Sequence, residues 1–285
     1  MNDTTLQLNG GRQLAFADIG DAHWPCVLFF HGAPSSRLRL AYLESEFLAR
    51  KIRVVSPDRP GYGGSTIQAG RSMNDWAGDV AALIEHLGLD RIMVAGHSSG
   101  GPYALACAAL IPGRIVGTIV LGGVTDMSWA GAWDGYLESE ARLMRLPTET
   151  AVIQACEALY GKDGAGFMSA SGIALSEPDE RLYSDESVAR LLSLARAEAF
   201  RQGVAGYAQD IFIQGRPWPF DPGDIATRVL VVHGEFDTML PVAHARHSVE
   251  VVRGSTLRIL PGHGHLSMLA ELPALSAELF AGSQS

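Results

Sequence analysis

The chain has 285 residues, 47% of them hydrophobic, and a formal net charge of −9 at neutral pH. This length suits one large α/β domain or two small ones, and the composition allows a substantial core. Because the charge is negative and lysine and arginine form no cluster, nucleic acid and anionic membranes are excluded as expected partners.

The sequence shows no targeting or membrane segment. Residues 1–5 contain neither a basic nor an apolar stretch, so no signal peptide is predicted. No apolar run approaches the ~18 residues of a membrane-spanning helix. Three cysteines are widely spaced, and two of them, Cys26 and Cys107, fall in predicted core elements, where a free thiol acts as a small hydrophobe. We therefore expect a cytoplasmic protein with no membrane partner.

The first predicted element is a β-hairpin, in which residues 5–8 and 14–16 flank Asn9-Gly10-Gly11. Apolar runs then predict strands of a parallel sheet. These strands occupy residues 26–30, 52–55, 92–95, 115–121 and 229–232, with residues 256–260 as the last strand.

Helices are predicted between these strands. Apolar spacing indicates a helix over 72–89, begun by Ser72 and Asp75 as a capping box, and a closing helix over 266–280. The alternation predicts an α/β fold, a mostly parallel sheet covered by helices on both faces.

Residues 126–215 interrupt this alternation. They contain helical segments such as 148–160 and 187–203 and scattered aromatic residues, but no convincing strand. The prediction is a core domain of residues 1–125 and 216–285 and a helical cap of residues 126–215, inserted between strands. Such a cap covers the strand ends where open α/β sheets bind ligands. Ordinary packing helices are the alternative interpretation.

The motif Gly96-His97-Ser98-Ser99-Gly100 joins the strand at 92–95 to a segment of small residues at 101–108. The order strand, tight turn, helix is the context of a nucleophile elbow. Its serine is held in strained backbone geometry, and only small neighbours let strand and helix pass so closely. Ser98 is therefore the candidate nucleophile.

A serine nucleophile needs a histidine as base and a carboxylate to orient it. The loop after the strand at 229–232 contains Asp237, and the loop after the last strand contains His265. Glu235 and Asp126 are alternative acids, and His263 is an alternative base. For Glu235 a hydrogen bond within its loop is the expected role.

An oxyanion hole is predicted where the strand at 26–30 ends in His31-Gly32-Ala33-Pro34. The glycine permits a sharp turn that leaves a backbone N–H free. We assign the two donors to Ala33 and to Ser99, the residue after the nucleophile.

With these motifs the chain resembles the α/β-hydrolase superfamily over essentially its whole length. The matching motifs are His31-Gly32, Asp58-Arg59-Pro60-Gly61-Tyr62-Gly63-Gly64-Ser65, Gly96-His97-Ser98-Ser99-Gly100, His233-Gly234-Glu235 with Asp237, and Gly262-His263-Gly264-His265. Residues 198–203 and 217–221 also resemble a bacterial subgroup of lidded hydrolases.

The resemblance implies the order nucleophile, acid, base for Ser98, Asp237 and His265, and a base placed after Gly-x-Gly. It implies positioning rather than proton transfer for His31 and His97. It gives His263 a structural role, and it leaves Asp126 open as the acid because some serine hydrolases use that position.

Neither a metal nor a cofactor is expected. His244 and His247 are three residues apart on a predicted helix, but no third ligand is near, so a solvated helix face is the interpretation we favour. Residues 61–64 lack the third glycine of a dinucleotide motif and any P-loop lysine. These glycines are expected to shape a turn at the rim of the active site.

A serine at the elbow indicates acyl transfer. The expected function is hydrolysis of small carboxylic esters through an acyl-enzyme. Alternatives on the same residues are amide or iminopeptidase cleavage, C–C bond hydrolysis, lactone opening and perhydrolysis. For an iminopeptidase, Glu138 and Glu140 would bind the amine, although exposure to solvent is their expected role. A ligand-binding module with a vestigial site is the alternative from another class. The sequence does not choose between monomer and homodimer.

Overall fold

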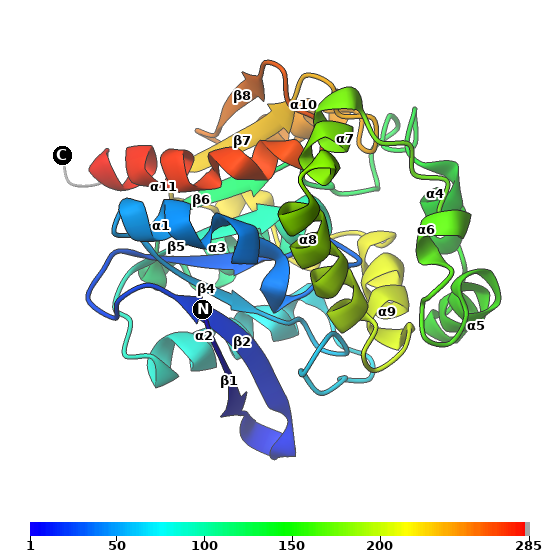
Figure 1. Ribbon diagram of the computed structural model, residues 1–285, viewed down its shortest axis with the longest axis horizontal. Helices are drawn as coiled ribbons and strands as arrows, with labels where there is room; N and C mark the ends of the chain where they lie inside the picture. Colours follow the sequence, from blue (N-terminus) through cyan, green and yellow to red (C-terminus); the bar gives the residue numbers. More distant parts are fainter. Residues whose placement is uncertain (283–285) are drawn as a thin grey trace.

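The computed structural model describes residues 1–282, which form an eight-stranded sheet in the order β1-β2-β4-β3-β5-β6-β7-β8 (Figure 1). β1 and β2 are antiparallel to their neighbours, and the other pairs are parallel. The strands are β1 (Asn2–Gln7), β2 (Gln13–Ile19), β3 (Cys26–Phe30), β4 (Arg53–Pro57), β5 (Ile92–His97), β6 (Ile115–Leu121), β7 (Val229–Gly234) and β8 (Thr256–Leu260).

The predicted α/β fold, with its mostly parallel sheet, is confirmed. The hairpin forms as β1 and β2 around a 3₁₀ turn at Asn9–Gly11. β3, β6 and β8 have the predicted bounds. β4 begins one residue later and ends two residues later than predicted, because it pairs with β2 as far as Pro57. The capping box of Ser72 and Asp75 is present at the start of α2.

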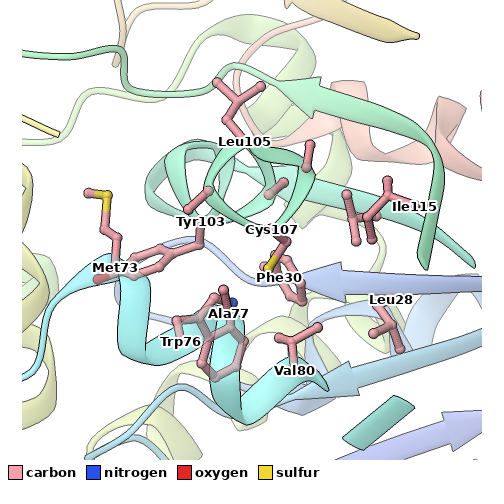
Figure 2. Packing of buried hydrophobic residues seen from close by; sticks show 14 of the residues in the cluster. Leu28, Phe30, Met73, Trp76, Ala77, Val80, Tyr103, Leu105, Cys107 and Ile115 are labelled. Carbon is pink, nitrogen blue, oxygen red and sulfur yellow. The ribbon is translucent and has the colours of Figure 1, made fainter. Parts of the chain in front are cut away.

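The core lies on both faces of the sheet, because successive strand residues point to opposite sides. In β3, Leu28 and Phe30 pack on one face and Val27 and Phe29 on the other. The first face is covered by α2 (Met73–His86), α3 (Gly101–Leu110) and α10 (Val242–Val251), and the second by α1 (Glu44–Ala49) and α11 (Leu272–Ala281). Figure 2 shows Trp76 of α2 beside Phe30 and Tyr103 in the first core.

Six helices lie between β6 and β7 and gather beside the sheet (green to yellow in Figure 1). They are α4 (Glu138–Met144), α5 (Glu149–Tyr160), α6 (Phe167–Ala170), α7 (Glu177–Ser184), α8 (Glu186–Ala199) and α9 (Ala205–Gln214). We call these helices the cap. The cap has a hydrophobic cluster that includes Phe167, Phe200 and Tyr207. The inserted helical cap is therefore confirmed, whereas the division into domains at 125/126 and 215/216 stays a prediction.

Buried charges join the cap to the loop between β4 and α2. Asp210 of α9 is fully buried and pairs with Arg59 and Arg71, whose guanidinium nitrogens lie 2.7 and 2.5 Å from its carboxylate oxygens. The hydroxyls of Tyr62 and Tyr103 donate to the same carboxylate, at 2.9 and 2.7 Å. The base of the cap is thus held by a single carboxylate shared among four donors.

Candidate active site

The elbow at Ser98 has the geometry that its sequence predicts. Ser98 adopts a φ of 53°, in the left-handed region that side chains rarely occupy. A Cβ atom on Gly96 would lie 2.2 Å from the Gly100 carbonyl oxygen, and a Cβ on Gly100 would lie 2.1 Å from that of Phe30. Only glycine permits these approaches, so the two glycines let strand, turn and helix meet tightly enough to expose Ser98.

Loops after β7 and β8 bring a carboxylate to a histidine. The His265 Nδ1 donates to Asp237 Oδ2 at 2.7 Å, and the other Asp237 oxygen accepts the amides of Met239 and Leu240, each at 2.9 Å. His265 and Ser98 line the same cavity. The structure therefore brings the three predicted residues to one edge of the sheet, the carboxyl ends of β5, β7 and β8.

The electrostatics of this pair suit a base and its orienting carboxylate. Burial raises the pKa of Asp237, but the charge and the hydrogen bond of His265 lower it by more than burial raises it. The pKa of Asp237 therefore lies below its ordinary value. Burial lowers the pKa of His265, but the charge and the hydrogen bond of Asp237 raise it by more, so that the pKa of His265 lies above 6.5. Asp237 is thus ionised at neutral pH, and an imidazolium at His265 is stabilised.

His97, directly before the candidate nucleophile Ser98, contacts the loop that carries the candidate base His265. Its Nε2 donates to the backbone carbonyl of His265 at 2.9 Å, and the two ring centroids are 4.8 Å apart. Burial, followed by the charge of His265, lowers the pKa of His97 well below its ordinary value. This neutral, buried ring supports the expected positioning role.

The turn after β3 has the form expected of an oxyanion hole. His31 Nδ1 donates to the Gly32 carbonyl at 2.7 Å, and its Nε2 accepts the amide of Arg59 at 3.3 Å, which fixes the turn. Ala33 lines the cavity, and its amide has no acceptor among residues 1–282. Ser99 lies in the 3₁₀ turn that leads into α3. The assignment of both amides as donors stays a prediction.

The alternative acids and the alternative base are engaged elsewhere. Asp126 accepts the amide and hydroxyl of Ser128 with one oxygen and the Trp218 amide, at 2.8 Å, with the other. Glu235 accepts the Gly262 amide at 3.0 Å within its loop, as expected. His263 donates to the Pro261 carbonyl at 2.9 Å. Asp237 is therefore the carboxylate that meets His265.

The cavity lies between the elbow and the cap and has a volume of about 100 Å³. One water needs only ~10–15 Å³, so a small organic group has room beside Ser98. Its apolar lining comes from both parts of the molecule and includes Val124, Leu137, Phe167, Ile173, Leu240 and Leu266. The site can therefore shield an acyl group from water.

Glu140 corrects one expectation. Glu138 is exposed as predicted, but Glu140 lines the cavity rather than facing solvent. Burial raises the pKa of Glu140, and its carboxylate accepts the hydroxyls of Tyr136 and Tyr207 at 3.0 and 3.4 Å. The surface interpretation was wrong for Glu140 because this residue lies on the face of α4 that meets the cavity, whereas Glu138 lies on the exposed face.

The interpretation of His244 and His247 as a solvated face was also wrong. His244 is buried, and its Nε2 donates to the Ala132 carbonyl at 3.0 Å. The ring of His247 stacks on Trp129 at 4.5 Å, and its Nδ1 lies 2.9 Å from the Thr125 hydroxyl. These histidines attach residues 125–132, which lead from β6 into the cap, to α10.

The glycine loop at 61–64 forms a turn, but not at the cavity rim, since none of its residues lines the cavity. A Cβ on Gly61 would lie 2.7 Å from the Gly206 Cα, so the loop packs against α9. Gln202 reinforces this contact by donating to the carbonyls of Gly63 and Ser65, both at 2.8 Å.

Two residues near the site were not predicted from the sequence. Arg39 lines the cavity, and Asp179 of α7 accepts the amides of Leu266 and Ser267, at 3.0 and 2.8 Å, next to His265. The signal for Arg39 was a charge inside the apolar run Leu38-Arg39-Leu40, just after the oxyanion turn. Asp179 had no such signal.

A comparison with known families matches residues 27–279 to the Alpha/beta hydrolase family. The chain belongs to this family. As an α/β hydrolase it is 26% identical to a bifunctional esterase/perhydrolase of Acinetobacter calcoaceticus, over 95% of this chain and 96% of the relative. It is 25% identical to a non-heme haloperoxidase of Rhodococcus erythropolis, over 96% of this chain and 97% of the relative.

Solved structures agree with this α/β hydrolase fold. A thermophilic esterase from Thermogutta terrifontis superposes with a TM-score of 0.72, at 21% identity and over 100% of both chains. None of the helices formed by residues 1–282 has the length and apolar character needed to cross a bilayer.

Proposed function

We propose that this α/β hydrolase cleaves carboxylic esters of small molecules through an acyl-enzyme on Ser98. The observation that carries the proposal is the hydrogen bond from His265 to Asp237, in a cavity that also exposes Ser98 on a strained elbow. The relative named as an esterase/perhydrolase supports the same reaction.

In the proposed mechanism His265 takes the proton of Ser98 as the hydroxyl oxygen attacks the ester carbonyl. Asp237 holds the His265 ring in the required tautomer and stabilises the imidazolium. His265 then donates this proton to the leaving alcohol, which gives the acyl-enzyme. A water activated by His265 releases the acid and restores Ser98.

The amides of Ala33 and Ser99 would stabilise the oxyanion of each tetrahedral intermediate. Their backbone N–H groups need no reorganisation when charge develops on the carbonyl oxygen. One such donor typically contributes about 2.7–4 kcal/mol to transition-state stabilisation. The N-terminus of α3, which follows Ser98, adds partial positive charge at the same place.

A second candidate reaction is perhydrolysis, because one relative is named esterase/perhydrolase and another haloperoxidase. Hydrogen peroxide would then replace water as the acceptor of the acyl group and give a peracid. An iminopeptidase is less favoured, since the two tyrosine hydroxyls already donate to Glu140.

The proposal is tested with Ser98→Ala and short p-nitrophenyl esters, assayed with and without hydrogen peroxide. We expect turnover by the wild type and a loss of roughly 10⁶-fold in the variant, because the nucleophile is gone. A fluorophosphonate should label wild-type Ser98 only. Ser169→Ala, which removes an exposed cap hydroxyl, is the matched control.

Turnover that survives in Ser98→Ala would contradict the mechanism. Absence of both turnover and labelling in the wild type would favour a ligand-binding module instead. Peracid formation that exceeds ester hydrolysis would select perhydrolysis.

A further inference from the structure

Arg39 places a buried cation in the proposed active site. It lies on the 3₁₀ helix η2 (Arg37–Leu43), which follows the oxyanion turn, and its side chain is only 6% exposed. It lines the same cavity as Ser98 and His265. The triad mechanism gives this guanidinium no role.

Within residues 1–282, Arg39 has no ion pair, and its Nε and Nη2 atoms have no hydrogen-bond partner. The other buried arginines all pair with carboxylates: Arg37 with Asp58, Arg53 with Asp18, and Arg59 and Arg71 with Asp210. Among the buried arginines of residues 1–282, Arg39 is therefore the one without a carboxylate partner, and it is also the one that lines the cavity.

An unpaired guanidinium in a buried site is unfavourable, because the desolvation of its charge is not compensated. Its fork of N–H donors matches the two oxygens of a carboxylate. The charge of Arg39 also acts on the catalytic group, since it lowers the pKa of both His97 and His265. An anion bound to Arg39 would therefore lie within electrostatic range of the reacting atoms.

The cap adds a second cation to the same cavity. Arg196 of α8 lines it, is partly buried, and has no ion pair within the described part of the chain. Helix α8 packs against η2, so the two arginines come from facing elements. Glu140 is the acidic residue of the lining, and its carboxylate accepts two tyrosine hydroxyls instead of pairing with either arginine.

We propose that the preferred substrates are small esters that carry a second, free carboxylate, and that Arg39 binds this carboxylate while Ser98 attacks the ester carbonyl. Arg196 supports the same anion from the cap. The preference for such esters rests on the proposed ester hydrolysis, whereas the binding of a carboxylate by Arg39 does not depend on it.

The kinetic test compares the monomethyl esters of succinate, glutarate and adipate with neutral isosteres in which an isopropyl group replaces the carboxylate. The measured quantity is the ratio of kcat/KM for each acid ester to that of its isostere. We expect a ratio above one in the wild type. Arg39→Met should lower it by roughly 10- to 100-fold, the effect of losing a charge-assisted hydrogen bond.

Arg39→Lys keeps the positive charge but lacks the paired N–H donors of the guanidinium, so it should give an intermediate ratio of kcat/KM values. If Arg39→Met does not fold, Arg39→Lys tests whether Arg39 binds the carboxylate. Arg190→Met removes an exposed arginine of α8 and should keep the wild-type ratio. A wild-type ratio of one or less, or equal losses on both ester series in Arg39→Met, would overturn the proposal.

The binding test uses succinate, glutarate and adipate with Ser98→Ala, read as a shift in melting temperature. We expect stabilisation by at least one dicarboxylate, and none in Ser98→Ala/Arg39→Met. Equal shifts in both proteins, or no shift in either, would overturn Arg39 as the binding group. If the wild type does not hydrolyse esters at all, this binding test alone decides whether Arg39 binds a carboxylate.

Discussion

The protonation of His265 is set by opposing neighbours, and this determines how activity should depend on pH. Burial and Arg39 lower its pKa, while Asp237 and Asp179 raise it, and the net position is above 6.5. Only the neutral ring can accept the proton of Ser98. We therefore expect kcat/KM for a neutral ester to rise with pH, with an acidic limb whose apparent pKa exceeds 6.5.

Asp237→Asn isolates the role of the acid at this residue scale. The asparagine cannot hold His265 in the required tautomer, so kcat should fall by roughly 10⁴-fold. Glu235→Gln, in the same loop but bound to Gly262, should retain the wild-type rate and profile. Both variants are assayed by ester hydrolysis from pH 5 to 9. A wild-type rate in Asp237→Asn would contradict the role of Asp237, and an acidic limb below pH 6.5 in the wild type would contradict the role of His265 as the base.

The sequence predicts the positions of some of these residues and not of others. That Ser98, Asp237 and His265 come together could be predicted because each follows an apolar strand, and parallel strands end at one edge of a sheet. Arg39 could not, because its lack of a partner depends on where every carboxylate of the folded chain lies. The inward position of Glu140 likewise depends on how α4 meets the cavity.

At the scale of elements, α9 is attached to α3 and to the loop between β4 and α2 through Asp210. Burial raises the pKa of this carboxyl, but the charges of Arg59 and Arg71 lower it more, and it lies below 3.8. Its stabilising contribution is therefore present above about pH 4 and is lost as the pH falls through the folded-state pKa. Sequence patterns could predict the helical insertion over residues 126–215, which contains α9. They could not predict this network, whose ion pairs join residues that are 139 and 151 positions apart in the chain.

We expect Asp210→Asn to lower the free energy of unfolding by about 3–5 kcal/mol, because two buried guanidinium groups lose their counter-charge. Thermal unfolding followed by circular dichroism at pH 7 measures the loss. Asp224→Asn, at an exposed position, should change stability little. A loss below about 1 kcal/mol for Asp210→Asn would show that the arginines find other partners.

At the scale of the whole molecule, the cap reaches the loop of His265, the proposed base, through Asp179. This carboxylate is fully buried, and one of its oxygens accepts the amides of Leu266 and Ser267. A Cβ on Gly264 would lie 2.6 Å from that oxygen, so the glycine before His265 allows the cap to approach. The charge of Asp179 also raises the pKa of His265, which links the cap to the protonation of the site.

Two substitutions separate the charge of Asp179 from its hydrogen bonds. Asp179→Asn keeps an oxygen for the two amides but removes the charge, so the acidic limb of kcat/KM should move to lower pH while the fold is retained. Asp179→Ala leaves both amides without an acceptor and should cost about 1–3 kcal/mol of stability. Glu180→Gln, exposed on the same helix, should do neither. If the acidic limb of Asp179→Asn stays at the wild-type pH, the cap holds the His265 loop without tuning its base.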